Sequence, residues 1–155
     1  EKFSSIIKNS TPDIDEETKK FLYDITNGSP GLINEYEFSE ILNIFERLID
    51  LIADKDPFSE RNNDTIKFLS VLDNEKLKVF ISFIKFILIT INKIKLGINI
   101  TKNYLSKSIL KIETISDKIS IDLIQRKLDY LINNENDLFT FNLDKKIFMI
   151  NFTTE

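Results

Sequence analysis

The stretch EKLKVFISFIKFILITINKIKL, residues Glu75–Leu96, decides the fold that this sequence predicts. Its apolar residues recur at three- and four-residue steps, which is the spacing of one helix face, and further apolar residues cover much of the remaining surface. A helix that is apolar nearly all round lies inside a helical bundle. We therefore predict that this helix is the centre of the fold, with its core at Phe80, Ile84, Ile87 and Leu88.

The sequence also predicts where the protein resides. The most apolar run, Val79–Ile91, contains Lys85 and is shorter than the roughly 20 residues that a membrane span needs. No positively charged, apolar signal segment opens the chain, and the lack of cysteine fits a reducing compartment. We expect a cytoplasmic protein without membrane contact.

The rest of the chain is also predicted to be helical, which makes the fold class all-α. A long amphipathic helix is expected over Phe38–Ile52, with its polar side opposite the core. Asp73-Asn74-Glu75 supplies the start of the central helix, and Gly97 ends it. The segment Phe139-Thr140-Phe141 alternates but has no other strand to pair with. Shorter helices are expected over residues 15–27, 65–72 and 101–112.

Two helices are predicted near the C-terminal end. The first follows a cap at Ser116 or Ser120, ends at a break over residues 133–137, and buries a stripe formed by Ile121, Ile124, Leu128, Leu131 and Ile132. The second begins at Asn142 as N-cap and is expected to bury Leu143, Ile147 and Ile150. Phe148 and Phe152 then lie on another side as possible interface residues. The alternative is that both rings close over Phe139 or Phe141 within the same domain.

The composition removes most catalytic chemistries. The 155 residues include no cysteine and no histidine, which excludes Ser-His-Asp and Cys-His catalysis and the common transition-metal sites. The acidic residues within 13–17 lack the glycine and the terminal glutamate of a calcium loop. We therefore expect no catalytic residue, no cofactor and no metal, and hence no enzyme.

The charge distribution argues against direct binding of nucleic acid. The formal net charge is −4, and the lysines are spread along the predicted helices. Phosphate contacts need a concentrated basic face. We expect these lysines to lie on solvated helix faces, and we expect no small-molecule substrate.

The pentapeptide Asn27-Gly28-Ser29-Pro30-Gly31 holds two of the three glycines and one of the three prolines. Gly28 can close one helix, Ser29 can cap the next, and Pro30 fits its first turn. The pattern Gly-x-x-x-x-Gly-Lys-Ser/Thr is missing. The pentapeptide is therefore predicted to be a corner between two helices and not a phosphate loop.

Two segments of the chain resemble the clamp-loader AAA+ family. Glu17–Ile33 looks like the lid of these subunits, in which a helix leads into a Gly-Ser-Pro turn. ATP-competent members usually carry an arginine after this proline, whereas Gly31 stands here, as in the delta-prime group. Asn142-Leu143-Asp144-Lys145-Lys146, followed by an apolar helix, is similar to an Asn-Leu-Asp-Arg-Lys segment near the C-terminus of that group.

The resemblance implies a lid fragment at residues 1–36 and a helical collar, the oligomerisation domain, of five or six helices at 37–155. A nucleotide-binding domain would precede Glu1. The implied function is noncatalytic: the collar binds other loader subunits of DNA polymerase III, and DNA and the sliding clamp are met only within that complex. The structural lid motif would be Gly28, Ser29, Pro30 and Gly31, and the collar motif Asn142 to Lys146. An unrelated helical regulatory or adaptor domain remains the alternative.

Overall fold

The computed structural model describes residues 16–25, 38–99 and 106–155. Within these ranges the chain forms helices and no strand, which confirms the all-α prediction. Six of the helices follow residue 37, as predicted for that part of the chain. The described helices are α2 Glu16–Ile25, α4 Phe38–Ala53, α5 Glu60–Ser70, α6 Asn74–Lys95, α7 Ser106–Ser116, α8 Ile121–Thr140 and α9 Lys145–Thr154.

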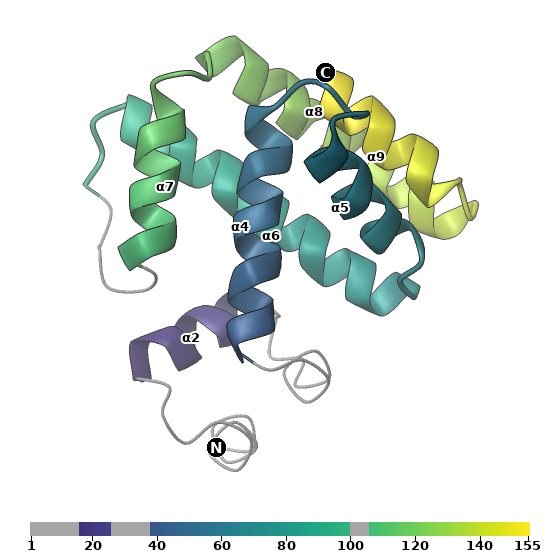
Figure 1. The fold of residues 1–155 in the computed structure, drawn as a ribbon, viewed down its shortest axis with the longest axis horizontal. Helices are drawn as coiled ribbons and strands as arrows, with labels where there is room; N and C mark the ends of the chain where they lie inside the picture. Colours follow the sequence, from purple (N-terminus) through teal and green to yellow (C-terminus); the bar gives the residue numbers. More distant parts are fainter. Residues whose placement is uncertain (1–15, 26–37, 100–105) are drawn as a thin grey trace.

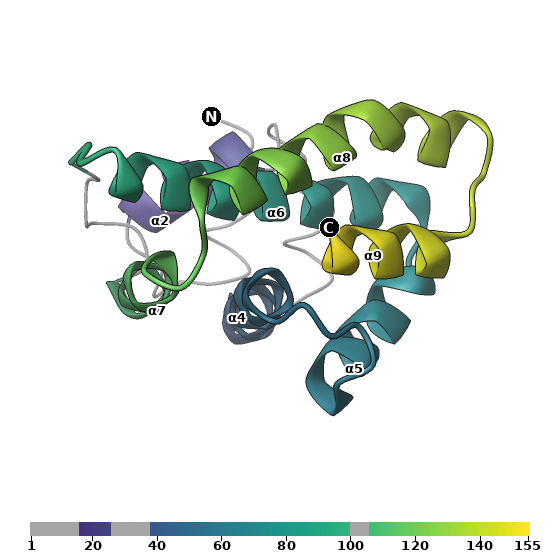
Figure 2. The ribbon, with the colours of Figure 1, turned by 90° about the horizontal axis from the view of Figure 1, so that it is seen from above.

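Helix α6 is the centre of the bundle. It packs against α8 on one side and against α4 and α7 on the other, and α2 also contacts it (Figures 1 and 2). Because α6 has neighbours on several sides, its apolar residues are buried around most of its circumference. The four side chains predicted to form its core are fully buried, which confirms that prediction: Phe80, Ile84, Ile87 and Leu88.

Aromatic rings join α6 to two neighbouring helices. The ring of Phe80 lies 5.8 Å from that of Phe68 on α5 and 5.7 Å from that of Phe83, centroid to centroid. Phe83 in turn lies 5.7 Å from Phe45 on α4. All three pairs meet edge to face, the arrangement that the ring quadrupoles favour. The phenylalanines of this region therefore form core and not an exposed stacking surface.

The ends of α6 lie where the sequence predicts them. The carboxylate of Asp73 accepts a hydrogen bond from the backbone N–H of Lys76 at 2.9 Å, which also lowers the pKa of Asp73. At the other end Gly97 has a φ of +69°, and the N–H of Ile98 donates to the carbonyl of Lys93 at 3.0 Å. This left-handed residue followed by a backward bond is a common helix stop that glycine allows.

Helix α8 runs through the break predicted at residues 133–137 and ends at Thr140. That prediction was wrong because tertiary contacts override the weak helix propensity of asparagine and aspartate. Glu135 pairs with Lys85 of α6, and Leu138 is buried in the core. Phe139-Thr140-Phe141 accordingly ends a helix instead of forming an extended piece. Helix α5 also starts earlier than predicted, at Glu60.

Helix α2 contributes Leu22, which is 1% exposed and belongs to the same buried cluster as the core of α6. The lid motif at Gly28, Ser29, Pro30 and Gly31 lies outside the described residues, as does the predicted boundary at residue 36. The division into a lid and a collar therefore stays a prediction.

Candidate functional site

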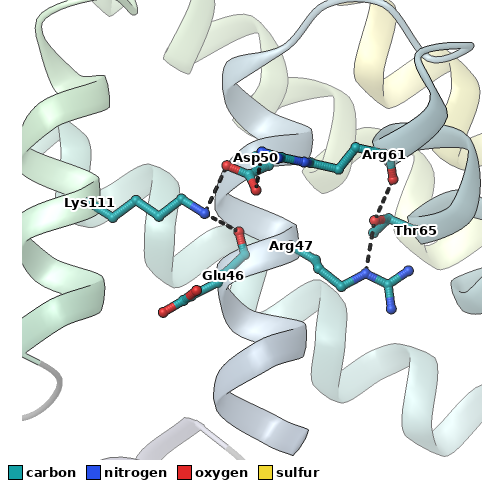
Figure 3. Close-up of polar contacts among 6 residues, drawn as sticks. All are labelled: Glu46, Arg47, Asp50, Arg61, Thr65 and Lys111. Atoms are coloured by element: carbon teal, nitrogen blue, oxygen red, sulfur yellow. Dashed lines mark hydrogen bonds and ion pairs between the residues drawn. The ribbon is translucent and has the colours of Figure 1, made fainter.

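A polar pocket of about 520 Å³ opens between α4, α5 and α7. Its centre is Asp50 on the polar side of α4. The carboxylate of Asp50 lies 2.8 Å from Nζ of Lys111 on α7 and 3.0 Å from a guanidinium nitrogen of Arg61 on α5 (Figure 3). Lys111 Nζ also donates to the carbonyl oxygen of Glu46 at 3.2 Å. One carboxylate thus links three helices.

Arg47 borders the same pocket from α4. Its Nε donates to the hydroxyl of Thr65 at 3.3 Å, and its guanidinium lies 5.4 Å from the ring centroid of Phe68 (Figure 3). The lining contains three cations and three carboxylates, so neither charge is in excess. A phosphate site concentrates positive charge, whereas the cations here already have partners within the protein. The pocket is therefore best described as a charged joint between helices. Its lining residues are Asn43, Glu46, Arg47, Asp50, Arg61, Asp64 and Lys111.

The predicted collar motif forms the corner between α8 and α9. Asn142 has a φ of +56°, a left-handed conformation that asparagine tolerates better than most residues. The N-cap of α9 is Asp144, whose carboxylate accepts from the N–H of Ile147 at 2.9 Å, and not Asn142 as predicted. Lys145 Nζ donates to the carbonyl oxygen of Leu72, just after α5, at 2.6 Å. The motif residues thus make a turn, a cap and a link to α5, while Lys146 is exposed.

The orientation of α9 is the opposite of the predicted one. Leu143 and Ile147, expected in the core, are 44% and 58% exposed. Phe148 and Phe152, the possible interface residues, are buried, with ring centroids 5.2 and 6.4 Å from that of Tyr130 on α8. The proposed interface at these phenylalanines is therefore wrong for the folded chain. The alternative of burial within the domain is right, although the ring that both contact is Tyr130.

Lys127 of α8 is the buried charge nearest to α9. Its side chain is 0% exposed, and Nζ donates to the carbonyl oxygens of Phe152 at 2.7 Å and Thr153 at 2.9 Å. The ammonium also lies 4.7 Å from the ring centroid of Phe152. The last carbonyls of a helix have no partner within it and carry the negative end of its dipole. Lys127 therefore binds the C-terminal end of α9.

Burial changes the proton affinity of two α8 side chains that face α9. Desolvation lowers the pKa of Lys127 to about 8, against a smaller opposing effect of Glu155. Desolvation likewise raises the pKa of the Tyr130 phenol, whose hydroxyl donates to the carbonyl oxygen of Phe148 at 3.0 Å. Both groups hydrogen-bond the backbone of α9, so their pKa values depend on the packing of α9 against α8.

The predicted inner face of α8 is right in part. Ile124 and Leu131 are buried, but Ile121 and Ile132 are 51% and 65% exposed. Lys127, which was predicted to lie on a solvated face like the other lysines, is instead fully buried. Apolar periodicity alone cannot find such a lysine, because its charge assigns it to the solvent side. The sequence signal that was available is its position three and four residues from Ile124 and Leu131, on their side of the helix.

Comparisons of this chain with protein-family models, with curated proteins and with solved structures find no match. The described helices include none that is long and apolar enough to cross a membrane. Over the same residues, no group of acidic side chains is placed to hold a metal ion.

Proposed function

We propose that this chain is a noncatalytic assembly subunit of a bacterial clamp loader, of the delta-prime type of DNA polymerase III. In this proposal residues 1–36 are the lid and residues 37–155 are the collar. The resemblance of Glu17–Ile33 and of Asn142–Lys146 to that group supports it, together with the helical bundle between the two segments. The chain would act in the cytoplasm and meet DNA and the sliding clamp only through its partner subunits.

The observation that carries the proposal is the form of the α8–α9 corner, where the collar motif lies. The corner is held by the Asp144 cap and by the bond from Lys145 to the carbonyl of Leu72. Three of its exposed side chains are nevertheless apolar, those of Phe141, Leu143 and Ile147. Exposed apolar patches commonly mark protein contacts. Leu143 and Ile147 thus replace Phe148 and Phe152 as the candidate interface residues.

Reconstitution tests this function. The 155-residue chain is mixed with the other loader subunits encoded in the same genome, and the mass of the complex is measured by size-exclusion chromatography with light scattering. We expect one complex that contains the chain. The double variant Leu143→Gln, Ile147→Gln should weaken it at least about tenfold, because fully burying a leucine or isoleucine side chain at a contact contributes about 1.5–3 kcal/mol.

The matched control is Leu110→Gln, which changes an apolar residue that is 57% exposed on α7, a helix that lies away from the α8–α9 corner (Figure 1). This variant should assemble like the parent chain. If the parent chain stays separate from all loader subunits, the clamp-loader proposal fails and an adaptor function gains support. If the parent assembles and the double variant assembles equally well, the corner is not the contact.

A further inference from the structure

Helix α9 is apolar on two sides. Phe148, Met149 and Phe152 face the interior, while Ile147 is 58% exposed and Ile150 is partly buried. At about 100° per residue, Ile147 lies about 100° to 140° around the helix from the two phenylalanines, with the exposed Asn151 and Thr154 beside it, while Ile150 packs at the edge of the core. Turning α9 about its axis would therefore exchange one apolar side for a partly apolar one. Burial of apolar surface favours the observed orientation, but it leaves the apolar Ile147 on the outer side.

Contacts to the backbone of α9 do distinguish the two orientations. Lys127 Nζ reaches two carbonyl oxygens in the last turn, those of Phe152 and Thr153. A carbonyl oxygen has a fixed direction relative to the side chains of its own helix. These two hydrogen bonds from one buried atom on α8, together with the bond from the Tyr130 hydroxyl to the carbonyl of Phe148, restrict both the rotation of α9 and its position along its axis.

Filling this position with a fully buried ammonium group costs more free energy than filling it with an apolar side chain. Burying a charge costs free energy that hydrogen bonds only partly return, and apolar replacements of buried charges are often neutral or stabilising. The methylenes of Lys127 could be replaced by an apolar side chain of similar length. The part of Lys127 that an apolar residue could not replace is the pair of bonds to α9.

We propose that Lys127 is a positioning residue that fixes the rotation and register of α9, so that Leu143 and Ile147 face outward. The binding of another loader subunit to Leu143 and Ile147 rests on the proposed function above. The positional role itself concerns only α8 and α9, and it can be measured in the isolated chain.

The chain lacks cysteine, so a single introduced thiol can report which side of α9 is exposed. Ile147→Cys probes the outer side and Met149→Cys the buried side, each in the parent and in Lys127→Met. In the parent, the thiol of Ile147→Cys should react with a labelling reagent much faster than the thiol of Met149→Cys. In Lys127→Met, we expect the ratio of the two labelling rates to fall by roughly tenfold or more. A local reorientation of α9 would expose the thiol at position 149, and it requires less free energy than global unfolding.

The matched control is Lys146→Met, which removes an exposed lysine from α9 itself and should leave the ratio unchanged. Methionine is unbranched and adaptable, so Lys127→Met should still unfold cooperatively. An unchanged labelling ratio in Lys127→Met would overturn the proposal. Loss of cooperative unfolding would also overturn it, because Lys127 would then be required for the whole fold. Neither labelling result depends on partners, so a failed reconstitution would overturn only the proposed function.

Discussion

Helices α6 and α9 are held in place by different kinds of contact. Helix α6 has α8, α4, α7 and α2 around it, so its apolar side chains meet other apolar side chains in nearly every direction. Helix α9 lies at the edge of the bundle between α5 and α8, and it buries one of two apolar sides. A surrounded helix can be positioned by packing alone. A helix at the edge with two apolar sides needs a directional contact as well.

The largest effect is expected in the centre. Replacing Phe80 with alanine removes a fully buried ring that contacts Phe68 and Phe83, and should lower the free energy of unfolding by about 3–5 kcal/mol. Urea unfolding followed by circular dichroism measures the loss. The control is Phe58→Ala, a ring that is 72% exposed, with an expected change within about 0.5 kcal/mol. Equal losses in the two variants would mean that the core is not centred on α6.

The second prediction concerns the two sides of α9. Phe152→Ala removes a buried ring and should cost about 3 kcal/mol, the lower end for phenylalanine because α9 has neighbours on only part of its surface. Ile147→Ala on the outer side should cost no more than about 0.5 kcal/mol. The same unfolding experiment compares them. A larger loss for Ile147→Ala would restore the orientation predicted from the sequence.

This contrast between α6 and α9 explains which predictions from the sequence were correct. The residues of α6 and α4 were assigned correctly because one long apolar pattern with several neighbours leaves few alternatives. For α9 the sequence favoured Leu143, Ile147 and Ile150, because three- and four-residue spacing fits them as well as it fits Phe148 and Phe152. The contacts that distinguish the two sides are hydrogen bonds to the backbone of α9 from Lys127 and Tyr130, which lie 25 and 18 positions away from Phe152 and Phe148.

The charged joint at Asp50 was missed for a related reason. The sequence places Asp50 on the polar side of α4, opposite the core. Arg61 and Lys111, which pair with it, come from two other helices and show no pattern of their own. Only the packing of α5 and α7 beside α4 brings the three charges together.

A smaller effect is expected from pH. Lysine titrates near 10.5 in the unfolded chain but near 8 at Lys127 in the fold, so between these values the unfolded chain binds more protons. The contribution of Lys127 to the free energy of unfolding therefore rises with pH, by roughly 2.5 kcal/mol between pH 8 and pH 10.5. The test is the difference in unfolding free energy between the parent and Lys127→Met, measured from about pH 8 to about pH 10.5.

The neighbouring groups that titrate or carry charge are common to both proteins, so their own effects largely cancel in this difference: Glu155, Lys55, Arg126 and Tyr130. Lys146→Met serves as control for the general loss of one positive charge. A difference that stays flat or falls with pH would contradict a buried ammonium at Lys127. A slope of the same size in Lys146→Met would assign the effect to net charge.

The most direct test asks whether Lys127 is needed because α9 has two apolar sides. The measurement is the labelling rate of the thiol in Met149→Cys, corrected for global unfolding. This rate is compared between two variants that both carry Met149→Cys. The first also carries Lys127→Met, and the second carries both Lys127→Met and Ile147→Gln. Glutamine makes the outer side polar, so apolar burial alone should then select the observed orientation. We expect Ile147→Gln to restore the slow labelling that Lys127→Met loses. If the thiol at position 149 stays equally reactive after Ile147→Gln is added, the two apolar sides are not the reason for the buried lysine.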